Sequence, residues 1–539
     1  MEFVGVIISS FQPLINWVIM MMIILVSFVV LWRLFISPSL AHMKLRRNGF
    51  NGPSPCFPLG NTTDIMASMT KTNASKDGIN HDIHSRVFPY FASWQKSFGK
   101  VFIYWLGTEP FLYVADPEFL KNVSGQVMAK GWGKPSVFKN DRKPMFGING
   151  LVMVEGEDWV RHRHVITPAF NKANLKEMAC LIVESATKML DGWATQISSG
   201  NPEIDVEREV ITTAGEVIAK TSFGISYESG RLVLEKLRAL QTTLFKTNRF
   251  VGVPFAKFLC PNKSLEANKL GKEIDGLLYS IVEARKVESQ NITKNNNKNN
   301  DTHHRQVHND LLGLLLKESS SNGVGAVKGG RSLSTRELVD ECKTFFFGGH
   351  ETTALAISWT MLLLAMYPQW QVELREEIKQ VIGDKEVDAT LLGGLKKMGW
   401  VMNEVFRLYP SAPNVQRQAR GDIKVGDRTI PNGTNMWIDV VAMHHDPALW
   451  GEDVNQFKPQ RFKDDILFGG CNHKMGFLPF GFGGRMCVGR NLSMMEYKIF
   501  LTLILSRFSF KLSPTYNHSP AIMLSLRPTQ GLPVLFQPL

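Results

Sequence analysis

The stretch Phe480-Gly481-Phe482-Gly483-Gly484-Arg485-Met486-Cys487-Val488-Gly489 decides the fold of this chain, and it places its glycines around a single cysteine. Glycine carries no Cβ, so a backbone rich in it can approach a flat group closely. The apolar segment 491–505 that follows predicts a helix, whose N-terminus would stabilise a thiolate, and an arginine can pair with a carboxylate. An isolated cysteine is otherwise most often an inert buried residue. The stretch therefore favours a thiolate site beside a flat cofactor.

The net charge of the 539-residue chain does not by itself decide which class of partner the protein binds. Its 61 Lys and Arg exceed its 49 Asp and Glu and give a formal charge of +12, which would suit a membrane surface, an acidic partner or nucleic acid. No zinc-ligand spacing or RNA-binding aromatic motif accompanies this charge, so we expect no nucleic-acid partner. The six cysteines form no CxxC pair, which fits a reducing compartment better than a disulfide framework.

The N-terminal region predicts a membrane anchor. Residues 14–32, LINWVIMMMIILVSFVVLW, carry no charge and are long enough to cross a bilayer as a helix. The basic residues follow this run, which favours an uncleaved signal-anchor with the remaining chain in the cytosol; a buried core helix is the alternative. We predict an anchor over 1–33, a basic, proline-containing hinge over 34–60 and one catalytic domain over 61–539.

The body reads as mostly helical. Apolar residues recur at helical spacing in 175–197, 231–245 and 269–285. Strands are expected as a pair within 101–115, near 422–429 and near the C-terminus. The polar segments 287–308 and 317–331 predict flexible surface loops, because they offer too little apolar surface to order themselves.

A long helix should follow the second polar segment. Ser334 and Glu337 form a capping-box pattern, and Pro368 should end the helix, which gives a length of about 45 to 50 Å. Within this helix, Phe345-Phe346-Phe347-Gly348-Gly349-His350-Glu351-Thr352-Thr353 sets two glycines and an acid–alcohol pair in an apolar run. A local widening there would make room for dioxygen, and Glu351 and Thr352 could handle protons; a kinked core helix with a satisfied Thr352 is the alternative.

The spacing of Phe480, Gly483, Arg485, Cys487 and Gly489 resembles the haem-binding signature of cytochromes P450. This resemblance extends from the anchor to Leu539. Within this family, the sequence is most similar to plant microsomal members of the clan that includes cytokinin hydroxylase and secologanin synthase. The resemblance implies a mainly α fold with small β-sheets, and haem b as a cofactor with Cys487 as the axial iron ligand.

Several side chains take roles by this resemblance alone. Glu351 and Thr352 match the acid and alcohol of the family's oxygen-activation motif. Trp159, Arg163, Arg417 and Arg485 match its partners of the haem propionates, with Phe480 and Gly489 in the haem-binding loop. Glu404, Arg407 and Arg461 match its structural triad, although Gln460 departs from the usual glutamate beside the arginine. His162 and His164 we expect to be exposed polar residues rather than iron ligands, since the cysteine already accounts for the metal.

The resemblance implies a monooxygenase that hydroxylates a small apolar molecule, of terpenoid, hormone or fatty-acid type. Electrons would come from NADPH through NADPH–cytochrome P450 reductase, and the site of action would be the cytosolic face of the endoplasmic reticulum membrane, with the lipid bilayer as the other partner. The pocket would draw on residues 131–150, 243–255, 412–416 and 519–523. The sequence does not name the substrate.

Two other functions share the cysteine motif. A haem-thiolate isomerase or dehydratase would rearrange a peroxide without dioxygen or reductase, and retention of Glu351 and Thr352 counts against it. A membrane-bound haem sensor or carrier would hold haem without turnover. The completeness of the motifs favours the monooxygenase.

Overall fold

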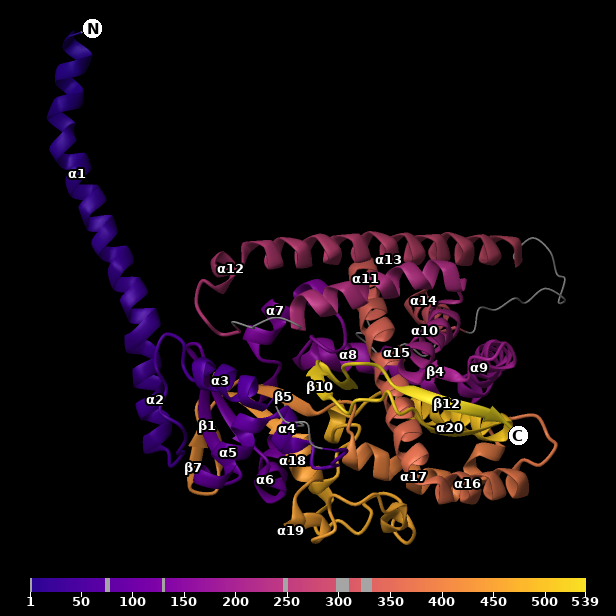
Figure 1. Cartoon of the computed structure of the whole chain (residues 1–539). Coiled ribbons are helices and arrows are strands. Elements are labelled where there is room, and N and C mark those ends of the chain that lie inside the picture. The colour runs from indigo at the N-terminus through magenta and orange to yellow at the C-terminus, as the bar shows by residue number, and fades with distance from the viewer. Residues whose placement is uncertain (1, 73–77, 128–130, 246–250, 297–309, 321–331) are drawn as a thin grey trace.

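The computed structural model describes residues 2–72, 78–127, 131–245, 251–296, 310–320 and 332–539. Helices make up most of the body, with one group of strands toward its lower left and another beside the C-terminus (Figure 1). The mainly helical fold class predicted from the sequence is confirmed.

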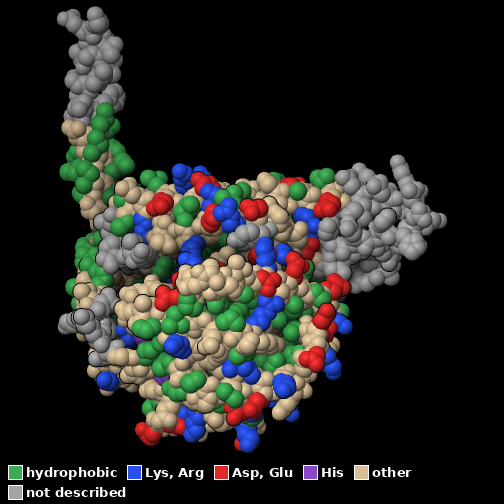
Figure 2. Space-filling model, turned by 45° about the vertical axis from the view of Figure 1, so that its right-hand side comes forward, with side chains coloured by type: hydrophobic (Ala, Val, Ile, Leu, Met, Phe, Trp, Pro, Cys, Tyr) green, Lys and Arg blue, Asp and Glu red, His purple; other side chains and the backbone are tan. Residues whose placement is uncertain are grey.

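The N-terminal helix projects away from the body (Figure 1). It comprises α1 (Glu2–Leu31), a short π-helical turn (Trp32–Ile36) and α2 (Ser37–Arg47). Among the described residues this is the one helix long and apolar enough to cross a membrane, and none of its most apolar window, which has a mean hydropathy of 2.8, is buried. Figure 2 shows apolar side chains around its described part, whereas charges of both signs are mixed on the visible face of the body.

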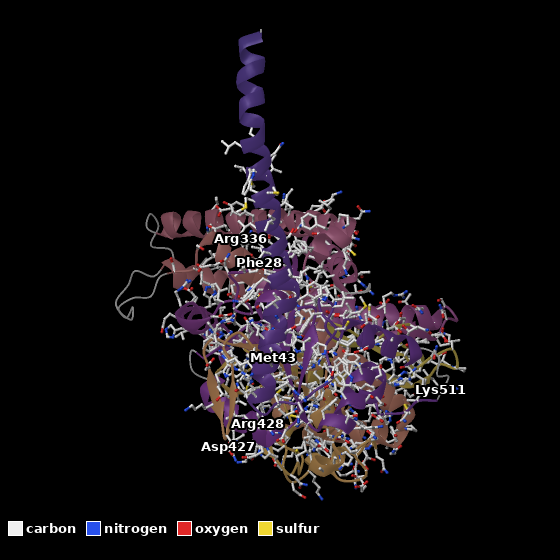
Figure 3. All side chains as sticks on the ribbon, turned by 90° about the vertical axis from the view of Figure 1, so that its left-hand side faces the viewer. Phe28, Met43, Arg336, Asp427, Arg428 and Lys511 are labelled. Carbon is white, nitrogen blue, oxygen red and sulfur yellow. The ribbon has the colours of Figure 1, made fainter. Side chains whose placement is uncertain are left out.

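Side-chain contacts attach the C-terminal end of α2 to the body. The Asn48 side chain donates to the Thr429 carbonyl at 2.8 Å, and the Arg428 guanidinium lies 5.5 Å from the centre of the Phe50 ring. Figure 3 shows Met43 on this helix and Arg428 near its lower end. The Trp105 indole also donates to His42 at 3.2 Å. These contacts fix where the projecting helix leaves the body.

Strands far apart in sequence build the main sheet. Its order is β1 (Val101–Leu106), β2 (Glu109–Val114), β8 (Asn435–Asp439), β5 (Asn414–Ala419) and β3 (Trp132–Gly133), with β2 and β8 parallel and the other neighbours antiparallel. The smaller sheets pair β6 (Ile423–Val425) with β7 (Arg428–Ile430), β10 (Pro520–Met523) with β11 (Ser525–Pro528), and β12 (Pro533–Pro538) with both β4 (Glu203–Asp205) and β9 (Phe508–Leu512). All the predicted strand regions are therefore confirmed.

The helix α15 (Thr335–Met366) runs through the centre of the body (Figure 1). Ser334 caps it in the predicted capping box, and it ends at Met366, with Tyr367 as the C-cap residue before Pro368. Most of its residues are buried because α10 (Val206–Phe223) and α20 (Arg490–Arg507) pack against it. Gly349 permits this approach, since a Cβ there would lie 2.2 Å from the Ile218 side chain.

The remaining helices surround this centre. Those that bear on the site are α7 (Ser136–Phe146), α8 (Gly156–Ile166), α11 (Tyr227–Phe245) and α17 (Lys396–Leu408). The others are α3 (Thr62–Thr72), α4 (His84–Val87), α5 (Pro89–Phe98), α6 (Pro117–Val127), α9 (Lys172–Ser198), α12 (Ala256–Leu259), α13 (Pro261–Asn296), α14 (Leu311–Ser320), α16 (Pro368–Val381), α18 (Val440–His444) and α19 (Pro447–Trp450), with short 3₁₀ turns between them.

The two predicted loops are shorter than expected. Helix α13 continues to Asn296 and α14 to Ser320, so residues 287–296 and 317–320 are helical. A helix nucleated by its packed part can propagate into polar sequence, because each further residue adds a backbone hydrogen bond. The rest of both segments, 297–308 and 321–331, lies outside the described residues.

Candidate active site

A cavity of about 470 Å³ lies inside the body, between α15 and the cysteine loop, residues 480–489. Thr352 and Gly348 contribute from α15, and α7, α8, α10, α20 and β5 are among the elements that supply the rest of the wall. A Cβ at Gly348 would meet no atom within 4 Å, so this glycine leaves the helix face open toward the cavity. Apolar and aromatic side chains form much of the remaining lining.

The cysteine loop presents Cys487 to this cavity. Gly481 and Gly483 have φ values of +75° and +66°, which residues with a side chain rarely adopt. The Cys487 amide donates to the Phe480 carbonyl at 3.0 Å and closes the loop. Cys487 is exposed and lines the cavity. Burial raises the pKa of the thiol, and the backbone amides of Gly489 and Arg490 oppose this rise.

Basic side chains gather at one edge of the cavity. On α8, Arg163 donates to the Met486 carbonyl at 2.9 Å, which ties this helix to the cysteine loop. The Arg485 guanidinium lies 4.8 Å from the centre of the Trp159 ring and donates to the Val154 carbonyl at 3.1 Å. The structure thus brings Trp159, Arg163 and Arg485 together, as the resemblance predicts.

Arg417 reaches the same edge from β5. It donates to the Gln416 carbonyl at 2.9 Å, while its buried Nε has no hydrogen-bond acceptor among the described residues. Burial first, and then the charge of Arg485, lower the pKa of Arg417 to about 10. A buried guanidinium with an unsatisfied donor favours an anion beside it. The thiol, the open helix face and this basic edge fit the sulfur ligand, the flat ring and the propionates of a haem.

The acid and the alcohol of α15 lie on different sides of the helix. The Thr352 hydroxyl lines the cavity and donates to the Gly348 carbonyl at 2.9 Å. The Glu351 carboxylate, 2% exposed, instead accepts from Gln241 at 2.9 Å and pairs with Arg527 at 3.3 Å. Helix α15 is α-helical throughout, so the predicted local widening is absent, because the Thr352 hydroxyl bonds the Gly348 carbonyl within a regular turn.

Glu351 borders a second cavity of about 390 Å³ behind α15. Its wall includes Arg238 and Gln241 from α11 and Arg527 from β11. Arg527 also pairs with Glu207 at 3.0 Å. Sequence reasoning missed Gln241 and Arg527, since neither belongs to a motif and only tertiary packing brings them to Glu351.

The structural triad forms a buried network below the cysteine loop. Arg407 on α17 makes a bidentate contact with Glu404, at 2.7 and 2.8 Å, and Arg461 approaches the same carboxylate at 3.5 Å. Arg407 also donates to the carbonyls of His444 at 3.0 Å and Val454 at 2.7 Å. The predicted grouping of the three charges is therefore present.

The prediction that His162 is exposed is wrong. This residue is fully buried, with its ring nitrogens 2.5 Å from Glu341 and 3.3 Å from Glu337 on α15. The two carboxylates offset the cost of burying the ring, so His162 links α8 to α15. His164 is exposed, as predicted.

The fold, the cysteine loop and the cavity together define a haem-thiolate oxidoreductase. Residues 78–534 match the family model described as cytochrome P450. The chain belongs to the cytochrome P450 family, and its cofactor is therefore haem b with a cysteine thiolate ligand. The enzyme is a monooxygenase.

Plant proteins resemble the chain over nearly its whole length. Two cytokinin hydroxylases of Arabidopsis thaliana are each 36% identical, one over 92% of both chains and the other over 94% of both. Cytochrome P450 734A1 of the same plant is 34% identical over 91% of this chain and 90% of its own. The resemblance to the plant members of the family is thus confirmed.

Proposed function

We propose that this monooxygenase hydroxylates a small apolar molecule of terpenoid, hormone or fatty-acid type. Dioxygen would be one substrate, and NADPH–cytochrome P450 reductase would supply the electrons. The observation that carries the proposal is the presentation of Cys487 to a largely apolar cavity that Thr352 also lines. The name of the cytokinin hydroxylases supports hydroxylation as the reaction.

Each site residue has a proposed task. A bound haem would activate dioxygen at its iron. Cys487 would donate its thiolate to the iron, and Trp159, Arg163, Arg417 and Arg485 would hold the propionates. Thr352 would hold a proton at its hydroxyl on the cavity side. Glu351 would receive protons from the second cavity, which it borders.

The projecting helix supports a membrane location. We propose that it spans the membrane of the endoplasmic reticulum once and leaves the catalytic domain in the cytosol. Arg33, Lys44, Arg46 and Arg47 follow the apolar run, and positive charge is retained on the cytosolic side of a membrane helix. The proposed division into anchor, hinge and catalytic domain follows from the same reasoning.

Product analysis tests the reaction. Microsomes carrying the chain and a plant reductase should convert at least one member of a panel of terpenoids, hormones and fatty acids to a product heavier by one oxygen atom. Conversion should need both NADPH and dioxygen. Conversion of a hydroperoxide without NADPH, and of no other compound, would instead support the isomerase. Bound haem without turnover would support the sensor.

The variant Thr352→Ala tests the proton role. We expect product formed per NADPH to fall at least about tenfold, while NADPH consumption continues and hydrogen peroxide accumulates, because general acid–base groups contribute about 10²-fold or more. Thr352→Ser keeps the hydroxyl and should keep most of the coupling. Unchanged coupling in Thr352→Ala would remove this residue from the proton route.

A further inference from the structure

Two serine hydroxyls in the wall of the active-site cavity lack hydrogen-bond partners. Ser411 lies in the connection between α17 and β5, and Ser525 is the first residue of β11. Both residues line the cavity. Their Oγ atoms are buried, yet neither has a hydrogen-bond partner in the part of the chain that the structure describes. Burying a hydroxyl without a hydrogen bond is unfavourable, so the two serines indicate a polar group that the cavity receives from outside.

A backbone hydrogen bond joins the two segments that carry these serines. The amide of Leu526, the residue after Ser525, donates to the Ser411 carbonyl at 3.1 Å. Since hydrogen-bonded segments lie side by side, both serines belong to one region of the cavity wall, and we call Ser411 and Ser525 the serine pair. Neither residue belongs to the cysteine loop or to the basic edge, which are the parts proposed to hold the haem.

The tip of the β10–β11 hairpin, beside the serine pair, has a strained backbone. Leu524 at this tip also lines the cavity, and its φ of +74° is uncommon for a residue with a bulky side chain. On one side of the tip, the Gln241 side chain donates to the Met523 carbonyl at 2.7 Å. On the other side, the Trp359 indole donates to the Leu526 carbonyl at 3.1 Å. Backbone strain persists where surrounding contacts enforce it, and it is frequent at ligand-binding sites. These contacts hold the hairpin tip in the cavity wall.

We propose that the serine pair binds an uncharged oxygen of the substrate, so that the substrate is an apolar molecule bearing a hydroxyl or carbonyl group away from the carbon that is hydroxylated. A serine hydroxyl can both donate and accept, so one substrate oxygen can satisfy both serines. Two hydroxyls offer hydrogen bonds but no charge, which suits a neutral oxygen better than a carboxylate. Leu524 would contact the apolar part of the same molecule. This inference rests on the proposed function and names the substrate class of its cavity.

Matched iron-binding probes test the inference without knowledge of the substrate. Each probe is an imidazole that carries on its first nitrogen a straight alkyl chain of graded length, ending in a hydroxyl, a methyl ketone or a methyl group. The probes are titrated into the full-length enzyme with its haem, and each affinity is read from the shift of the haem absorption that the imidazole causes. At the best chain length, we expect the hydroxyl or the ketone probe to bind at least about fivefold more tightly than the methyl probe, because it satisfies the serine pair. The preferred probe shows which of the two oxygen groups the serine pair takes.

Variants assign this preference to the serine pair. Ser411→Ala and Ser525→Ala should each lower the ratio of oxygen-probe to methyl-probe affinity, and the double variant should bring it to one or below, while the methyl probe keeps its affinity. Ser493→Ala is the matched control. Ser493 lines the same cavity, but its hydroxyl is already hydrogen-bonded to the Thr353 hydroxyl at 2.8 Å, so the ratio should equal that of the wild type.

Two results would overturn the proposal: a methyl probe that binds as tightly as both oxygen probes at every chain length in the wild type, or an oxygen preference that survives in the double variant. A structural role for the serine pair would weaken all three probes by the same factor in the variants and would also overturn it. The wild-type ratio stands even where a variant fails to fold. Absence of any imidazole-induced shift would contradict the haem site itself, which separates failure of the proposed function from failure of this inference.

Discussion

Cys487→Ala should leave the protein without measurable turnover and without the thiolate-type absorption band of its reduced carbon monoxide complex. The thiol is the sulfur that the cysteine loop presents to the cavity, and alanine offers the iron no ligand. The Arg163, Arg417 and Arg485 side chains remain in the variant, so haem could still bind weakly. The spectrum of the reduced carbon monoxide complex and the NADPH-dependent product yield together measure the effect.

An exposed cysteine provides the control. Cys180 lies on the surface of α9, and Cys180→Ala should keep both the spectrum and the product yield. If Cys487→Ala retained the thiolate-type band, another residue would have to be the ligand, and the assignment would fail. A loss in both variants would indicate damage to folding rather than loss of a ligand.

Local sequence signals predicted those parts of the fold that depend on local physics. The Ser334–Glu337 capping box and Pro368 set the two ends of α15, because capping and the missing proline amide act within one turn. The strand pair in 101–115 surrounds a glycine turn and formed as expected. The parallel pairing of β2 with β8 could not be predicted in this way, since it joins segments more than 300 residues apart and depends on the packing of the whole body.

In the site, too, some features follow from sequence motifs and others depend on tertiary packing. The resemblance to the family implied that Cys487, Arg485 and Thr352 belong to one site, and the structure places all three in the lining of one cavity. The direction of the Glu351 side chain is set by Gln241 and Arg527, which lie on other elements and carry no motif. The prediction that His162 is exposed was wrong for a similar reason. An isolated polar residue is usually exposed, whereas the burial of His162 depends on two carboxylates that α15 places beside it.

A large loss of stability is expected when the triad of Glu404, Arg407 and Arg461 is broken. Arg407→Ala should lower the free energy of unfolding by about 3 to 5 kcal/mol, because it leaves the fully buried Glu404 carboxylate without its bidentate partner. It would also remove the donors to the His444 and Val454 carbonyls. Since a folded domain is stable by only about 5 to 15 kcal/mol, we expect little soluble, haem-loaded enzyme. Denaturant unfolding and the haem content per protein chain measure this loss.

Removing the Arg407 side chain should also disturb the cysteine loop, because a series of hydrogen bonds connects the two. Arg407 holds the backbone at His444, whose ring accepts a hydrogen bond at 2.9 Å from the amide of Leu478, a lining residue just before the loop. The control is Arg231→Ala, which removes exposed ion pairs with Glu228 and Glu235 and should cost less than about 1 kcal/mol with unchanged haem content. An Arg407→Ala enzyme as stable and as fully loaded as the Arg231→Ala control would show that the triad does not support the haem side of the fold. A stable variant with reduced haem content would instead confine its role to the position of the loop, because His444 and Leu478 can shift without global unfolding.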